Sequence, residues 1–239
     1  MPARTITKGE SRRLSCCRLA VGVASWTYAE INKVEIAAYW EKAHVARPKL
    51  FDGTVHLLSE YELQDEALSG TLFPTDFKSF LYWREQGYPE CGLRDAFGAS
   101  VIRSSEGHVL LGLQSEGHLN SGLAYPPSGM IDQNDVRDGM IDIDASIERE
   151  LEEETGLRPV DFRRVPGYIL TILAPFMAIA IEWQSTLPAA ALRERILAHV
   201  GSEAEPELAD IVIVRSAADI GNVPLQPYAE PLLRLLLHA

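Results

Sequence analysis

The sequence has few cysteines, no cluster of basic residues and no long apolar run. Its three cysteines, Cys16, Cys17 and Cys91, are odd in number and lack paired metal spacing, which argues against a disulfide framework and favours reduced thiols in the cytoplasm. No run of about 18 apolar residues occurs, so we expect no transmembrane helix and no membrane partner. The 22 Lys and Arg residues against 34 Asp and Glu give a net charge of −12, which disfavours a nucleic-acid polymer as partner.

The hydrophobic patterning predicts alternating helices and strands. We expect helices over residues 29–45, 77–83, 187–200 and 226–238, and strands over 54–58, 67–72, 96–103, 108–113, 168–184 (broken at Pro175) and 211–214. Residues 114–143 form a long irregular stretch, and loops of such length inside a compact domain are usually functional or disordered. Composition changes after Cys91, so we predict an N-terminal α/β extension over residues 1–90 and a second domain over 91–239.

The most informative segment is residues 149–157. Glu150, Glu153 and Glu154 stand at i, i+3 and i+4, so a helix places all three carboxylates on one face. Three like charges on one face repel each other, and a chain usually keeps such an arrangement where a cation binds. Ligands that are all oxygen suit Mg²⁺ or Mn²⁺, and Mg²⁺ commonly works with bound phosphates.

The ends of this helix are also predicted. Asp142 or Asp144 can cap its first turn, and Gly156 suits the left-handed position after its last. Ile147 and Leu151, four residues apart, form an apolar stripe beside the carboxylates. The acids should therefore lie where the helix meets the core.

This segment resembles the second half of the Nudix box, G-x5-E-x7-R-E-U-x-E-E-x-G-U, where U is apolar. Every specified position of that half is matched. The first half matches less well: residues 127–129 are similar to the Pro-Gly-Gly turn that opens the box, but Ile141 stands where the family has its first Glu. The loop also carries several extra residues. Asp138 and Asp142 are the candidates to replace the absent Glu.

The resemblance covers residues 96–238 and implies a fold of the α/β (α+β) class, a Nudix-type α/β/α sandwich around a mixed sheet. It implies a divalent-metal-dependent hydrolase that cleaves a nucleoside diphosphate linked to another moiety. By the same resemblance, Glu153 and Glu154 would be the main metal ligands. Glu150 would be a further ligand or would deprotonate the attacking water, and Arg149 would pair with a box carboxylate.

Further site residues follow from the resemblance or from position. The carbonyl of Ser128 would complete the metal shell, and a late-loop acid, Glu205 or Glu207, would join it. Tyr125 is a candidate to stack on a base or sugar. Arg103 and Arg137 are candidates to contact phosphate, with a solvated surface position as the alternative for each.

The substrate is suggested by a second resemblance. Residues 48–53 and 75–81 are similar to the N-terminal region of UDP-glucose and GDP-mannose hydrolases of the family, with Asp52 where those carry Asn and Phe77 where they carry Tyr. A nucleotide sugar is therefore the first hypothesis. ADP-ribose, coenzyme A and dinucleoside polyphosphates are alternatives, as is a ligand sensor that has lost turnover with its early Glu. Residues 1–90 would form the contact of a homodimer, a substrate lid, or both.

Overall fold

The computed structural model describes residues 9–23, 25–48 and 50–237. The helices are α1 (Thr27–Ile31), α2 (Lys33–Ala46), α3 (Phe77–Glu85), α4 (Ile143–Thr155), α5 (Ala189–Val200) and α6 (Ala229–Leu237). The strands are β1 (Glu10–Leu14), β2 (Cys16–Val21), β3 (Thr54–Gln64), β4 (Ala67–Asp76), β5 (Asp95–Arg103), β6 (Val109–Gln114), β7 (Ala124–Tyr125), β8 (Ser128–Met130), β9 (Val136–Arg137), β10 (Met140–Ile141), β11 (Arg163–Arg164), β12 (Tyr168–Leu173), β13 (Phe176–Gln184) and β14 (Leu208–Val214). The short 3-10 helices are η1 (Gln133–Asp135), η2 (Pro159–Asp161) and η3 (Ala217–Asn222). No helix in these ranges is long and apolar enough to cross a membrane.

The larger sheet has the strand order β1-β12-β13-β5-β6-β14. β13 and β5 run parallel along their whole length, and the other neighbours on this path are antiparallel, so the sheet is mixed as expected. The predicted hairpin is confirmed as β5-β6, although only Ile102 and Arg103 of β5 pair with β6 and residues 97–99 pair with β8 instead.

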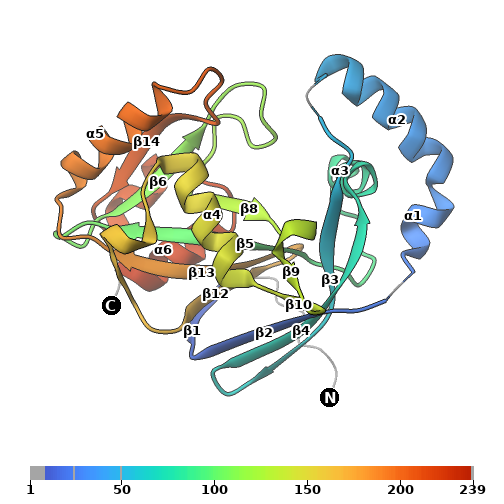
Figure 1. Ribbon diagram of the computed structural model, residues 1–239, viewed down its shortest axis with the longest axis horizontal. Helices are drawn as coiled ribbons and strands as arrows, with labels where there is room; N and C mark the ends of the chain where they lie inside the picture. Colours follow the sequence, from blue (N-terminus) through green and yellow to red (C-terminus); the bar gives the residue numbers. More distant parts are fainter. Residues whose placement is uncertain (1–8, 24, 49, 238–239) are drawn as a thin grey trace.

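Helices cover both faces of this sheet (Figure 1). Ile179 and Ile181 of β13 belong to a core that also contains apolar residues of α4 and α5. Ala180, between them, belongs to a second core with α6, because successive strand residues point to opposite faces. The expected α/β/α sandwich around a mixed sheet is therefore confirmed.

The smaller sheet has the order β3-β4-β2-β10-β9 and joins the N-terminal segment to the middle of the chain. Its outer strands β9 and β10 come from the loop before α4, where Met140 pairs with Ala20 of β2. Conversely, β1 joins the larger sheet by pairing with β12. The division into residues 1–90 and 91–239 stays a proposal, and strands cross it in both directions.

The stretch 114–143, expected to be irregular, contains short strands that long-range pairing holds in place. β7 pairs with β6, β8 with β5, and β10 with β2. Strands of two or three residues are too short to show a period in the sequence, so their pairing could not be predicted.

The helix α4 begins and ends as predicted. The Asp142 carboxylate accepts the Ala145 backbone N–H at 3.1 Å, and Gly156 adopts φ 65° after the last turn. Asp144, the other candidate cap, binds the guanidinium of Arg164 instead. The local signals for this helix were therefore sufficient to place it.

α4 packs directly on β5, and this contact requires a glycine. Ile147 and Leu151 are fully buried, as the apolar stripe predicted. A Cβ on Gly98 of β5 would lie 2.6 Å from Cγ1 of Ile147. The close approach of helix and strand sets how far the acidic face of α4 stands above the sheet.

Gly98→Ala should therefore destabilise the protein by about 1–3 kcal/mol, because the added methyl overpacks a core contact. Gly221→Ala is the matched control, since a Cβ there meets no atom within 4 Å. Urea denaturation of both variants measures the difference. Equal midpoints would show that α4 can move off the sheet freely.

Candidate functional site

Two carboxylates of α4 face the short strand β8. Glu154 is buried, and its Oε1 accepts the Ser128 backbone N–H at 2.8 Å. Glu150, one turn earlier, lies against the next residue of β8: a Cβ on Gly129 would stand 2.0 Å from its Cδ. A larger residue at position 129 would displace the Glu150 carboxylate. The box turn and the acidic helix are thus in direct contact.

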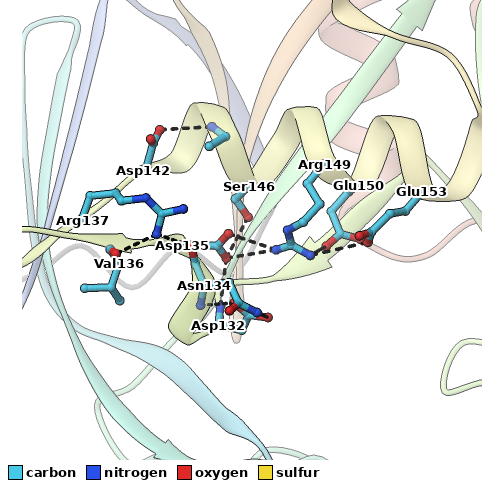
Figure 2. Close-up of polar contacts among 11 residues, drawn as sticks. Asp132, Asn134, Asp135, Val136, Arg137, Asp142, Ser146, Arg149, Glu150 and Glu153 are labelled. Carbon is cyan, nitrogen blue, oxygen red and sulfur yellow. Dashed lines mark hydrogen bonds and ion pairs between the residues drawn. The ribbon is translucent and has the colours of Figure 1, made fainter.

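Arg149 forms ion pairs with three acidic side chains (Figure 2). Its Nη1 lies 2.7 Å from Oε1 of Glu150 and 3.6 Å from Oε2 of Glu153, and its Nη2 lies 3.0 Å from Oδ1 of Asp135. Asp135 is itself buried and accepts hydrogen bonds from the Ser146 hydroxyl at 3.1 Å and the Asp132 backbone N–H at 3.0 Å. The expected pairing of Arg149 with acids of the box segment is present.

Asp135, and neither Asp138 nor Asp142, is the acid of this loop that pairs with Arg149. Asp142 caps α4, while Asp138 is exposed in the turn between β9 and β10. The sequence carried a signal. Five residues separate Gly129 from Asp135, which is the spacing between the first Gly and the first Glu of the box. Counting backward from Arg149 missed it, because the β9-β10 hairpin is inserted after the acid rather than before it.

Glu207 approaches the same carboxylates from the start of β14. The Gln114 side-chain amide donates to its Oε1 at 2.9 Å. Burial, then the negative charges of Glu153 and Glu207, raise the pKa of Glu150 to about 7 against the opposing charge of Arg149. Burial, followed by Glu207 and Glu150, raises the pKa of Glu154 well above its usual range. Of the two late-loop candidates, Glu207 is the one brought to the box acids.

This donor set suits a hard divalent cation, although the side chains do not converge on one point. Among the described residues, no three acidic, His or Cys side chains form a group close enough to hold a metal ion. Glu153 keeps 61% of its side chain exposed, and Glu154 is turned to the Ser128 N–H. A cation would relieve the like-charge crowding of Glu150, Glu154 and Glu207, which the protein by itself leaves partly uncompensated.

A cavity of about 320 Å³ opens beside these acids. Four of the predicted site residues line it, namely Tyr125, Ser128, Glu150 and Glu207. Arg149, Glu153 and Glu154 lie on α4 outside the lining. Arg103 and Arg137 also lie outside it: the Arg103 guanidinium donates to the carbonyls of Leu236 and Gly107, and Arg137 donates to the carbonyls of Asn134 and Val136. These arginines are occupied within the protein and are not brought to the cavity.

Sequence reasoning missed several polar residues of the cavity wall. Arg84 comes from α3, Asp95 from the first position of β5, Gln114 from the last position of β6, and Asn120 from the loop after it. Arg84 is the one Arg or Lys among the described lining residues. No local pattern marks these residues, because they meet only after α3 has packed beside the larger sheet.

No family model and no curated protein matches the sequence. The structure is similar to Nudix hydrolases. The hydrolase RenU of M. smegmatis has 15% identity over 59% of this chain and 83% of its own, with a TM-score of 0.39. The MutT protein of Methanosarcina mazei Go1 has 19% identity over 60% of this chain and 92% of its own, with a TM-score of 0.38.

Shewanella oneidensis NrtR, solved in complex with a 27mer DNA, has 18% identity over 60% of each chain and a TM-score of 0.39. At such identities and scores a likeness says nothing about substrate or partner. The function is therefore argued from the side chains of the box and its cavity.

The buried ion pair of Asp135 gives a direct test of the box geometry. Asp135→Asn keeps the shape of the side chain but removes the charge that Arg149 meets, and should lower the free energy of unfolding by roughly 1–3 kcal/mol. Asp138→Asn, in the exposed hairpin turn, is the matched control and should stay within about 0.5 kcal/mol of the parent. Chemical denaturation measures both. A larger loss in Asp138→Asn would contradict the assignment of the paired acid.

The raised pKa of Glu150 predicts how stability depends on pH. Between its ordinary value of 4.5 and about 7, the folded protein keeps a proton that the unfolded chain has released. The metal-free protein should therefore lose stability as the pH rises through this window. At about 1.4 kcal/mol per pKa unit, the loss reaches up to roughly 3 kcal/mol.

Urea denaturation in EDTA at several pH values between about 4.5 and 7.5 checks this. Glu150→Gln cannot ionise, so its stability should fall less than that of the parent over the same window. Parallel curves for the two proteins would show that Glu150 is not the group responsible.

Proposed function

We propose that the protein is a divalent-cation-dependent pyrophosphohydrolase that cleaves the diphosphate bridge of a nucleoside diphosphate derivative, with a nucleotide sugar as its substrate. The observation that supports this most is the acidic face of α4, held by the Arg149–Asp135 pair beside a cavity that Glu207 also lines. Net charge and the acidic wall favour a small phosphate compound over a nucleic-acid polymer as the partner.

Each residue has a role set by its position. Glu153 and Glu154, with Glu150, Glu207 and the carbonyl of Ser128, are proposed to hold Mg²⁺ or Mn²⁺. A bound cation of this kind supplies positive charge to the diphosphate oxygens and lowers the pKa of a bound water. Of the three box acids, Glu150 lines the cavity and has a pKa of about 7, which suits a group that takes a proton near neutral pH.

The other residues orient these groups or contact the substrate. Arg149 reaches Asp135, Glu150 and Glu153, so it fixes the acidic face relative to the loop. Tyr125 is buried in the cavity wall and is proposed to contact the base or sugar. Arg103 and Arg137 have no part in the proposal, because neither lines the cavity.

The alternative of an inactive ligand sensor rested on the absent early Glu. Asp135 supports the active reading, since it provides a carboxylate to Arg149 from the position that the box spacing predicts. The other enzyme readings, with ADP-ribose, coenzyme A or a dinucleoside polyphosphate as substrate, use the same box. A panel of such compounds with Mg²⁺, and with the products separated by chromatography, distinguishes them from nucleotide sugars.

Glu154→Gln should lower kcat on the preferred substrate by at least about 100-fold, because it removes a charge from the centre of the acidic site. Glu152→Gln is the matched control, since Glu152 neighbours the site acids on α4 but is exposed. Circular dichroism of both variants establishes that each is folded. Turnover retained in Glu154→Gln, or lost equally in Glu152→Gln, would overturn the site assignment.

A further inference from the structure

A buried carboxylate with few hydrogen bonds lies on the cavity wall. Asp95, at the start of β5, is 6% exposed and lines the cavity. The Tyr88 hydroxyl donates to its Oδ2 at 3.3 Å, and no other side-chain hydrogen bond reaches the carboxylate from the described residues. Burying a carboxylate this sparsely bonded costs free energy unless a ligand supplies donors. The cavity is the side from which a ligand can do so.

The one guanidinium of the cavity wall lies near this acid. Arg84 donates through Nη2 to the Leu119 carbonyl at 2.6 Å and to Oδ1 of Asn120 at 2.9 Å, and its side chain also hydrogen-bonds Tyr88. A guanidinium has five N–H donors, so these three contacts leave two for a ligand. Its positive charge opposes the effect of burial on the Asp95 carboxyl. An acceptor and a donor thus share one wall of the cavity.

Aromatic rings connect this wall to the acids of α4. The hydroxyls of Tyr228 and Ser128 lie 3.3 Å apart, and the ring of Phe176 lies 6.4 Å from that of Tyr228. Tyr88, which donates to Asp95, has its ring 5.4 Å from that of Phe176. Between the wall that carries Asp95 and the acids of α4, the cavity therefore offers apolar surfaces against which a flat heterocycle packs.

A chain of hydrogen bonds links Arg84, on the wall that carries Asp95, to Glu207 beside the acids of α4. Asn120, which accepts from Arg84, donates through its backbone N–H to Oε1 of Gln114. The other end of the Gln114 amide donates to Glu207. A group bound at Arg84 and a diphosphate near Glu207 would therefore contact one connected framework.

We propose that Asp95 and Arg84 form the base-recognition wall of the cavity, and that the base they select is guanine. Asp95 would accept two adjacent N–H groups, those of the ring amide and the exocyclic amine, while Arg84 would donate to the neighbouring carbonyl oxygen. The inference rests on the proposed function, for which it names the substrate class: a guanosine diphosphate linked to another moiety.

The other bases fit this pair less well. Adenine and cytosine place an unprotonated ring nitrogen beside their amine, and uracil places a carbonyl on each side of its one N–H. In each case a lone pair would face the buried carboxylate, so the site would discriminate by repulsion as well as by lost hydrogen bonds.

Binding without turnover tests the proposal. GMP, AMP, CMP and UMP are titrated by calorimetry into the full chain in EDTA. GMP should bind at least about 10-fold more tightly than the other three, since each alternative leaves a buried polar group unpaired. Asp95→Asn and Arg84→Gln should each remove most of this preference, while Arg137→Gln, outside the cavity, should preserve it. Equal affinities for the four nucleotides in the parent protein would overturn the proposal whatever the variants do.

Hydrolysis separates this inference from the proposed function. With Mg²⁺, GDP-linked compounds should have the highest kcat/KM, and Asp95→Asn should act mainly by raising KM. Hydrolysis of GDP-, ADP- and UDP-linked compounds with equal kcat/KM would support the proposed function and overturn the guanine assignment. Selective GMP binding with no hydrolysis of any compound would support the guanine assignment and overturn the proposed function.

Discussion

The ion pair between Arg149 and Asp135 joins the acidic helix to the loop that precedes it, and much of the site depends on it. Asp135 is buried and receives a hydroxyl and a backbone N–H besides the guanidinium, so its charge is well satisfied. A buried pair is costly to break from one side, because the remaining charge is left without a partner. The pair therefore fixes where the loop lies relative to Glu150 and Glu153.

The N-terminal segment contacts the loop that carries Asp135 and contributes residues to the cavity wall. The His56 backbone N–H of β3 donates to the Ile131 carbonyl at 2.9 Å, and Val55 forms a bridge with Asp132. α3 brings Arg84 and Phe80 to the cavity wall. Residues of the extension thus shape the site directly, so the substrate preference need not be a property of the box.

The site concentrates negative charge on buried carboxylates, and this arrangement opposes stability. Burial and mutual repulsion raise the pKa values of Glu150 and Glu154, which weakens the folded state when both are ionised. Under the proposed function, the same crowding favours a bound cation and suits Glu150 to accept a proton. Functional sites commonly keep such uncompensated arrangements because neutralising them would remove the chemistry.

The sequence by itself determined α4, its end at Gly156 and the shared face of Glu150, Glu153 and Glu154, and it narrowed the cap to Asp142 or Asp144. These features depend on contacts within about four residues, which the spacing of the chain sets directly. It also predicted most of the strands and helices, and the resemblance of residues 149–157 to the Nudix box implied the layered α/β class. Only the tertiary structure decided which acid meets Arg149 and which late-loop glutamate approaches the box.

The tertiary structure also brought Asp95 and Arg84 to one wall and left Arg103 and Arg137 outside the cavity. The β9-β10 hairpin lengthens the segment between Asp135 and Arg149 beyond the spacing of the box. The pairing of β1 with β12 and of β10 with β2 joins segments far apart in the chain. Contacts of that range follow from how whole elements pack, because the burial of their apolar faces places the polar side chains. No local pattern of residues carries that information.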